Sequence, residues 1–267
     1  MSNPRVSLSV SDEGIAYVKL NRPDKLNALD MPMFKAINST ITKIQKDKSI
    51  RVVIVSGAGE DFCSGLDVKS VMKSASAAVN LLFKWLPGNA NLAQKVTARW
   101  RDLPVPVIMA IHGRCWGGGM QIALGGDFRI ACPEASLSIM ESRWGLIPDM
   151  AGNTALTRLM PIDQAMKLAM TAETFSGAEA LDYNLVTELS ESPEQKAKEL
   201  ASQLVKRSPD VLAAIKKLYQ NNWNKSQRDM LGKESWYQVR ILSGKNQKVA
   251  VAREQGKERS YKTPKNW

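Results

Sequence analysis

Two uninterrupted apolar runs constrain the fold of this chain more than any other feature. Residues 51–57 read RVVIVSG and residues 106–113 read PVIMAIHG, without the alternation of a half-exposed strand. A strand of this kind must be covered on both faces, which is typical of parallel sheets. Between residues 31 and 45 the apolar residues instead recur at helical spacing. The order strand, helix, strand predicts an α/β fold with a largely parallel sheet.

The rest of the chain separates into a strand-bearing part and a helical part. Residues 6–10 and 15–20 flank the turn SDEG and predict a β-hairpin, and residues 128–132 predict one more strand. From Asn153 onward strand signals disappear, and the last third is expected to be almost entirely helical. Pro209 suits the first turn of a helix, with Ser208 as its cap. The Lys- and Arg-rich tail 245–267 is expected to be solvated or to lie across a partner subunit. The expected helices are 155–159, 162–170, 177–183, 194–206, 210–222 and 226–242.

Charge and cysteine content limit the partners and the compartment. The 267 residues contain 37 Lys and Arg against 26 Asp and Glu, a formal charge of +11, which favours an anionic partner such as nucleic acid, a membrane surface or a phosphorylated small molecule. Three widely spaced cysteines predict neither a disulfide framework nor a zinc site and fit a reducing, cytoplasmic setting. No run of 18 apolar residues occurs, so we expect a soluble protein without a membrane span.

Several common catalytic arrangements are excluded by residue counts and missing motifs. His112 is the single histidine, and the pattern G-x-S-x-G is missing, which argues against a Ser-His-Asp hydrolase. The phosphate-binding motif G-x-x-x-x-G-K-[ST] and the zinc motif H-E-x-x-H are also missing, and GAGEDF lacks the third glycine of a dinucleotide fingerprint. His112 itself, at a strand end, is expected to be structural.

Two glycine-bearing loops and two carboxylates remain as candidates for chemistry. DFCSGLDVKS, residues 61–70, and HGRCWGGGMQ, residues 112–121, each follow an apolar strand, where α/β sheets bind ligands. Glycine lets backbone N–H groups approach a negative charge closely. Glu141 and Asp149 come next along the chain, and an oxyanion site with two proton-handling acids suggests enolate chemistry. The alternative is structural: Glu141 could pair with Arg143 or Arg158, and Asp149 could cap the following helix.

Five short motifs, taken together, resemble one known family. They are collinear over roughly residues 5–220, and in this order they resemble the signatures of the crotonase family, also called the enoyl-CoA hydratase/isomerase family. The resemblance implies a crotonase-like spiral of ββα units in residues 1–200 that carries the site. It also implies that a C-terminal helical region, residues 201–267, covers the site and packs between subunits of a homotrimer or homohexamer. The motifs are LNRPDKLNAL (20–29), FCSGLDVK (62–69), HGRCWGGG (112–119), GDFRIA (126–131) and GLIPDMAG (145–152).

The same resemblance implies where an acyl-coenzyme A (CoA) thioester would bind. The thioester oxygen would be held by the backbone N–H groups of Leu66 and Gly118, which form the oxyanion hole. CoA would enter as part of the substrate, with no metal or redox cofactor, and its phosphates would account for the basic charge of the chain. Fatty acid metabolism, as in β-oxidation, is the implied setting. The other implied substrate-binding residues are Lys25, Ala28, Ser64, Gly65, Asp67, Val68, Gly117 and Gln121.

The carboxylates at the expected catalytic positions differ from those of the family's hydratases. Hydratases carry two glutamates, whereas this chain has Gln121 at the first position and keeps Glu141 at the second. Glutamine cannot exchange a proton at neutral pH. Asp149 resembles an acid of the family's dienoyl-CoA isomerases, although those also carry an acid where Gln121 stands. The expected function is therefore a double-bond shift in an enoyl- or dienoyl-CoA, with Glu141 and Asp149 as catalytic residues.

Other activities within the family stay open. The nearest alternative is an enoyl-CoA hydratase in which Asp149 replaces the lost glutamate. The aroyl-CoA dehalogenases of the family use an aspartate near this turn as nucleophile, but they do not share the glutamate at Glu141. From a different class, a basic chain of this family could bind RNA, which is the least favoured of these hypotheses.

Overall fold

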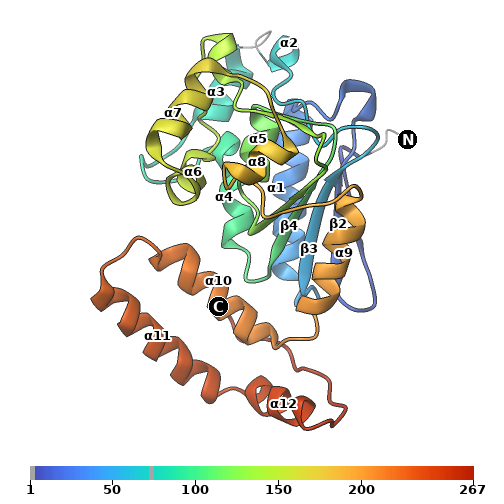
Figure 1. Cartoon of the computed structure of the whole chain (residues 1–267), viewed down its shortest axis with the longest axis vertical. Coiled ribbons are helices and arrows are strands. Elements are labelled where there is room, and N and C mark those ends of the chain that lie inside the picture. The colour runs from blue at the N-terminus through green and yellow to red at the C-terminus, as the bar shows by residue number, and fades with distance from the viewer. Residues whose placement is uncertain (1–3, 72–74) are drawn as a thin grey trace.

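A computed structural model describes residues 4–71 and 75–267, and its main feature is a six-stranded sheet (Figure 1). The strands lie in the order β1-β2-β3-β4-β6-β9. β1 pairs antiparallel with β2, as the predicted hairpin requires, and every later pair in this sheet is parallel. The strands are β1 (Val6–Val10), β2 (Ile15–Leu20), β3 (Val52–Gly57), β4 (Val107–Ile111), β6 (Phe128–Ala131) and β9 (Glu188–Leu189).

The two apolar runs form the central strands β3 and β4, and both of their faces are covered. Val53 and Val55 join the larger core cluster with α1 (Met31–Lys46) and α4 (Leu92–Asp102). Val52 and Ile54 join a second cluster on the other face, against α9 (Pro193–Leu204). Burial on both faces is the physical reason that these runs are uniformly apolar.

A smaller sheet stands beside the main one and gives the fold its spiral. β5 (Arg114–Trp116) pairs parallel with β7 (Ser136–Ser138), which pairs antiparallel with β8 (Phe175–Ser176). Two turns of the spiral, β4-β5-α5 and β6-β7-η2, each have a strand in the main sheet, a short strand in the smaller sheet and a helix. Sequence patterns missed β5, β7, β8 and β9, and the expectation that no strand follows Asn153 is wrong for β8 and β9. Strands of two or three residues are too short to show a period.

The helices cover the sheets and continue beyond them (Figure 1). α1 and α4 pack together on one face of the main sheet, and α9 contacts β3 and β4 from the other. The remaining helices are η1 (Pro23–Lys25), α2 (Val68–Val71), α3 (Ala75–Leu82), α5 (Gly118–Ala123), η2 (Glu141–Trp144), α6 (Asn153–Leu159), α7 (Ile162–Thr171), α8 (Gly177–Asp182), α10 (Pro209–Asn222), α11 (Gln227–Leu242) and α12 (Lys245–Glu254).

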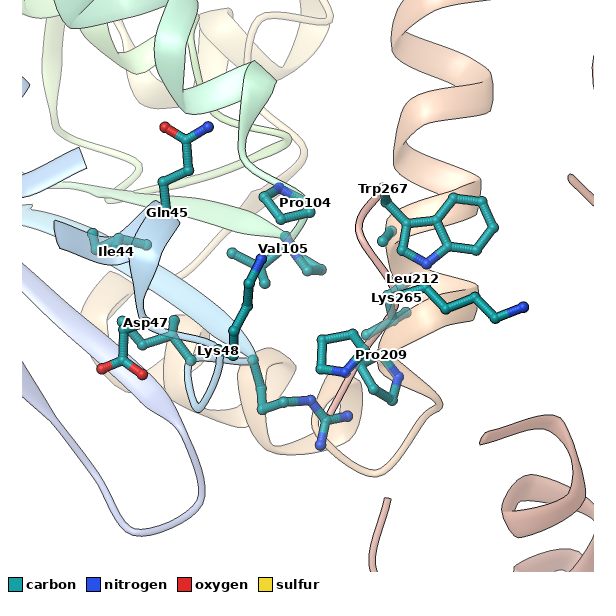
Figure 2. Close-up of a pocket in the computed structure, with 15 residues that line it drawn as sticks. Ile44, Gln45, Asp47, Lys48, Pro104, Val105, Pro209, Leu212, Lys265 and Trp267 are labelled. Carbon is teal, nitrogen blue, oxygen red and sulfur yellow. The ribbon is translucent and has the colours of Figure 1, made fainter. Parts of the chain in front are cut away.

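Most of the C-terminal tail is exposed, as expected, although two of its last residues also contact their own chain. Lys245 opens α12, and the backbone N–H of Lys265 and the indole N–H of Trp267 both donate to Asp210 of α10. Figure 2 shows Lys265 and Trp267 beside Pro209 and the Pro104–Val105 turn, around a cavity of about 20 Å³. Pro209 begins α10 as predicted, but the Ser208 side chain makes no capping bond.

Candidate active site

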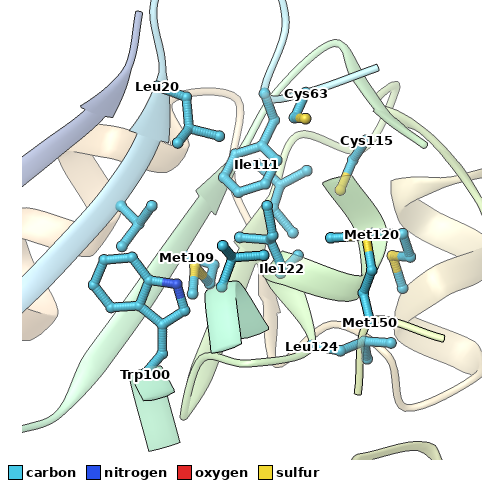
Figure 3. Close-up of a cluster of buried hydrophobic side chains, with 14 of the residues drawn as sticks. Leu20, Cys63, Trp100, Met109, Ile111, Cys115, Met120, Ile122, Leu124 and Met150 are labelled. Carbon is cyan, nitrogen blue, oxygen red and sulfur yellow. The ribbon is translucent and has the colours of Figure 1, made fainter. Parts of the chain in front are cut away.

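The two glycine loops lie against each other through close backbone contacts. Cys63 N donates to Arg114 O, and Trp116 N donates to Cys63 O at 3.0 Å. A methyl group on Gly65 would lie 2.7 Å from Trp116 O, and one on Gly119 would lie 2.3 Å from Cys63 O. No side chain fits in these gaps, so glycine is required for the loops to meet. Beneath them, Cys63, Cys115, Met120 and Met150 belong to one buried cluster (Figure 3).

The predicted oxyanion donors come together where these loops meet. Gly118 N is the first amide of α5, and the α-carbon of Gly65 is close enough that its added methyl group would lie 3.3 Å from that nitrogen. Within residues 4–71 and 75–267, neither Leu66 N nor Gly118 N donates to a backbone carbonyl or a side chain of the chain itself. Leu66 is held beside Leu29 by an isolated parallel bridge. Two free N–H groups on neighbouring loops can both donate to one ligand oxygen.

A third loop, residues 22–28, packs against the first glycine loop, residues 61–70. Leu26 and Asn27 both have left-handed backbone conformations, and Ala28 N donates to Lys25 O. The Asn27 amide is fully buried and donates to Ala58 O and Asp61 O, while its oxygen accepts from Arg22 N. Loop 22–28 is therefore rigid, and it presents Lys25 at the surface.

Arg22 joins this third loop to the SGLD loop. Its guanidinium donates to Ala28 O at 3.1 Å and to Asp67 Oδ2 at 2.9 Å. Burial opposes ionisation of Asp67, but its bonds with Arg22 and Ser70 N outweigh that cost and lower its pKa. Ser64 N donates to Leu26 O and Leu29 N to Gly65 O, so the residues expected to bind CoA lie on two loops tied to each other. Val68 follows as the first residue of α2.

Glu141 begins η2 and lies against the glycine triplet. Its residue is only 9% exposed, and a methyl group on Gly117 would lie 3.7 Å from Glu141 Oε1. Oε1 accepts a hydrogen bond from Gln121 Nε2, whereas Oε2 is buried and has no partner among the described residues. Burial raises the Glu141 pKa, the bond from Gln121 opposes that shift, and the charge of Asp149 adds to it. A buried carboxylate oxygen without a partner is costly to a fold, which makes it a functional candidate.

Asp149 lies on the loop that runs from η2 to α6. It is at the surface of the chain, but partial burial of its carboxyl group raises its pKa. The loop is fixed next to it: Met150 N and Gly152 N donate to Gln121 Oε1, and Arg101 Nη2 donates to Ala151 O at 3.1 Å. The charge of Asp149 also contributes to the raised pKa of Glu141.

The structural alternatives for these two acids are wrong. Glu141 forms no ion pair with Arg143 or Arg158 in the described part of the chain, and Arg158 Nη1 instead donates to Gln220. Asp149 does not cap α6, which begins at Asn153 after Gly152. His112, predicted to be structural, has its Nε2 3.0 Å from Gly59 O.

Sequence reasoning missed Arg22 and Asn27 as residues that shape the site. Both lie inside the motif LNRPDKLNAL, so the motif carried the signal. Their role could not be seen there, because their partners are Asp67, Ala58 and Asp61, distant in sequence.

Comparison with known proteins identifies the family to which this chain belongs. The model of the family described as enoyl-CoA hydratase/isomerase matches residues 11–260. The chain belongs to this family. It is 32% identical over 226 residues to a probable enoyl-CoA hydratase of Bacillus subtilis (strain 168), covering 81% of this chain and 82% of that protein. It is 33% identical over 218 residues to a carnitinyl-CoA dehydratase of Salmonella typhi, covering 80% of each.

A solved family structure confirms the predicted crotonase-like fold. The enoyl-CoA hydratase of Bacillus anthracis superposes with a TM-score of 0.86 at 27% identity, covering 97% of this chain and 99% of that one. The protein is thus an acyl-CoA enzyme of the hydratase/isomerase type. Across residues 4–71 and 75–267, no cluster of three or more potential metal ligands occurs. None of the helices described is both long and apolar enough to span a membrane.

Proposed function

We propose that this enzyme shifts a double bond in an enoyl- or dienoyl-CoA. Glu141 Oε2 takes a proton from the acyl chain, and the electron pair of the broken C–H bond delocalises onto the thioester oxygen. Leu66 N and Gly118 N hold the resulting oxyanion. Asp149 then gives its proton to a different carbon of the conjugated system. Atoms and charge balance when Glu141 returns its proton to Asp149, directly or through water, so the proposal includes no metal or redox cofactor.

The observation that carries this proposal is the free oxygen of Glu141. Oε2 is buried without a partner among the described residues, while Oε1 lies near Gly117 and accepts from Gln121, a group that cannot titrate. Such a carboxylate has one atom available as a base. Water addition in the two-glutamate members of the family uses a second carboxylate where Gln121 stands here, and that difference favours proton transfer over hydration.

Asp149 suits the role of proton donor. Its pKa is raised by burial, which keeps part of its population protonated at higher pH than an ordinary aspartate. Its loop is hydrogen-bonded to Gln121, which also donates to Glu141, and this shared partner supports both acids working on one substrate. We expect a bell-shaped pH dependence: activity rises with pH as Glu141 ionises and falls as Asp149 loses its proton.

Exposed apolar side chains near these acids fit an apolar acyl group. Trp144 and Ile147 lie between Glu141 and Asp149 in sequence and are 61% and 75% exposed. η2 packs on α7, where Met166 and Met170 are also exposed. A thioester with an aliphatic or aromatic acyl chain would bury this surface, which is otherwise unfavourable in water.

The test is an isomerisation assay with a dienoyl-CoA in D₂O. We expect a shifted absorbance and incorporation of solvent deuterium at the carbon that receives the proton. Asp149→Asn keeps the shape of the side chain and removes the proton, so turnover should fall by about 10²–10⁴ while CoA affinity stays nearly unchanged. Full turnover in Asp149→Asn would show that this proton shuttle is wrong.

Hydration of a 2-enoyl-CoA is the second candidate, because the relatives named above are a hydratase and a dehydratase. Under that hypothesis Glu141 and Asp149 would activate water together. We expect weak or no hydration of crotonyl-CoA by the native protein and a measurable gain on Gln121→Glu. Brisk native hydration that survives Asp149→Asn would establish the hydratase and reject the isomerase.

We also propose that copies of the chain associate as homotrimers or homohexamers in the cytoplasm. Tyr219 of α10, Trp223 directly after it, and Leu231 and Trp236 of α11 are all more than half exposed. A groove of about 580 Å³ runs along α10 against β6 and α6. Exposed apolar surface of this extent favours a subunit contact. The three free cysteines fit a reducing compartment. Light scattering after gel filtration measures the assembly.

A further inference from the structure

Gln121 makes contacts that neither a catalytic nor a substrate-binding role requires. The side chain is 1% exposed on α5. Its oxygen accepts from Met150 N at 2.8 Å and from Gly152 N at 3.3 Å, and its nitrogen donates to Glu141 Oε1. One amide therefore connects the helix of the oxyanion loop to both catalytic carboxylate segments.

The two backbone donors determine which way the amide faces. Met150 N and Gly152 N can only donate, so the side-chain oxygen must point toward them and the NH₂ group must point toward Glu141. This orientation places a donor against Glu141 Oε1 and leaves Oε2 as the carboxylate oxygen without a partner. Gln121 thus selects the oxygen that can act as the base.

The same contacts fix the loop that carries Asp149. Gln121 holds the amides at positions 150 and 152, and Arg101 holds the carbonyl of Ala151, whose φ of 69° is in the left-handed region. A methyl group on Gly152 would lie 2.9 Å from Gln121 Cγ, so the loop approaches as closely as glycine allows. Asp149 is adjacent to this fixed segment, and its distance from Glu141 depends on it.

We propose that Gln121 is a positioning residue that clamps Glu141 and the Asp149 loop to α5, so that Glu141 Oε2 and the Asp149 carboxyl face the same substrate. The role rests on the proposed proton shuttle, and Gln121 itself exchanges no proton in it. A hydratase-type glutamate at this position would place a second carboxylate oxygen against Glu141 Oε1 and would have to share a proton with it. The amide avoids that coupling, and its hydrogen bond favours the ionised form of Glu141 against the effect of burial.

The test removes the hydrogen bonds while keeping the length of the side chain. In Gln121→Met, we expect turnover in dienoyl-CoA isomerisation to fall by up to about a hundredfold, because the two acids lose their alignment. KM for the acyl-CoA should stay unchanged, because the loops with Leu66 and Gly118 are intact. Loss of a bond to the ionised carboxylate raises the Glu141 pKa, so the acidic limb of the pH profile should move up by about one pH unit.

A readout without catalysis separates this inference from the proposed function. The δ-carboxyl of Glu141, ¹³C-labelled and assigned by its loss in Glu141→Gln, should titrate at higher pH in Gln121→Met than in the native protein. Ile122→Val is the matched control: it trims the neighbouring buried residue of α5 without touching the amide and should move neither readout.

Each outcome decides the question. An unchanged Glu141 titration in Gln121→Met, or an equal change in Ile122→Val, overturns the clamp and leaves Gln121 as packing alone. The expected titration shift in a protein that isomerises no dienoyl-CoA supports the clamp and rejects the isomerase. Gln121→Glu, assayed at acidic pH where the introduced carboxyl is protonated and can donate to Glu141, should recover more turnover than Gln121→Met.

Discussion

The glycine loops around Gly65 and Gly118 are held by their own chain on several sides, whereas no residue of α11 is fully buried. In the loops, added methyl groups would meet backbone atoms at 2.3–2.7 Å. Along α11, a methyl group on Gly232 would meet nothing within 4 Å. Figure 1 shows α10, α11 and α12 on the far side of the molecule from α5.

This difference indicates which contacts stabilise each region. The loops of the candidate site depend on contacts within one chain, and a single added methyl group would prevent those contacts from forming. The C-terminal helices expose apolar faces that one chain does not cover, so we expect their stability to depend on a second surface. In this single chain they do not lie over α5, and the prediction that they cover a site and pack between subunits requires the assembly to be measured. Four changes test the contrast, and the largest effects are expected at the site.

Glu141→Gln should have the largest effect. It keeps the size of the side chain and removes the only proposed base, so isomerisation should fall by about 10²–10⁴. Affinity for CoA thioesters should stay nearly constant, because Leu66 N and Gly118 N are unchanged. Steady-state kinetics and calorimetry with an acyl-CoA measure the two quantities. If turnover survives, the base is another group and the buried oxygen of Glu141 has no catalytic role.

Gly119→Ala should follow, through backbone displacement. Its methyl group would lie 2.3 Å from Cys63 O, and the loops would have to move apart. Displacing the oxyanion donors should cost about 10²–10³ in kcat. Gly232→Ala, on α11, is the matched control and should leave kcat unchanged. Equal losses in both variants would erase the proposed difference between the two regions.

Much of the fold could be predicted from the sequence because its signals are local. The hairpin, β3, β4 and α1 follow from apolar patterns that each element carries itself. α12 could not be predicted in this way, because its sequence KNQKVAVARE is charge-rich and only three of its residues are buried. Its position is fixed instead by contacts with α10 and the tail. Trp267 contacts Asp210, 57 residues away, which no local pattern reveals.

The candidate site was predicted in its residue types but not in its connections. The five collinear motifs contain parts of both loops and Asp149, and Glu141 lies just before the last of them. The side-chain nitrogen of Gln121 faces Glu141 because the side-chain oxygen accepts from the backbone amides of Met150 and Gly152. These two residues lie 29 and 31 positions away in the sequence. The free oxygen of Glu141 likewise depends on packing in three dimensions.

Trp236→Ser on α11 should affect assembly and leave chemistry nearly unchanged. The indole is 61% exposed in the single chain. If it packs between subunits, its loss should weaken each contact by about tenfold to a hundredfold, because burying a large apolar side chain contributes about 1.5–3 kcal/mol. Analytical ultracentrifugation over a dilution series measures the change. Trp85→Ser is the control, since Trp85 is 87% exposed outside the C-terminal region and should leave the assembly intact.

Asp210→Asn should have the smallest effect on function and still destabilise the C-terminal region. Asp210 is 5% exposed and accepts from Lys265 N, Trp267 Nε1 and Asn246 Nδ2. An amide would place its NH₂ group against one of these donors, at a cost of about 1–3 kcal/mol. For a chain of this size, each kcal/mol lowers Tm by about 2–4 °C.

Calorimetry at one protein concentration measures this shift, because assembly makes Tm depend on concentration. Glu258→Gln, at an exposed tail position, is the control and should leave Tm within experimental error. Isomerase turnover should stay constant in both variants, since α10 and the tail lie away from α5. Lost turnover in Asp210→Asn with an unchanged Tm would instead mean that the C-terminal region takes part in the site, as expected if it covers the site in a neighbouring subunit.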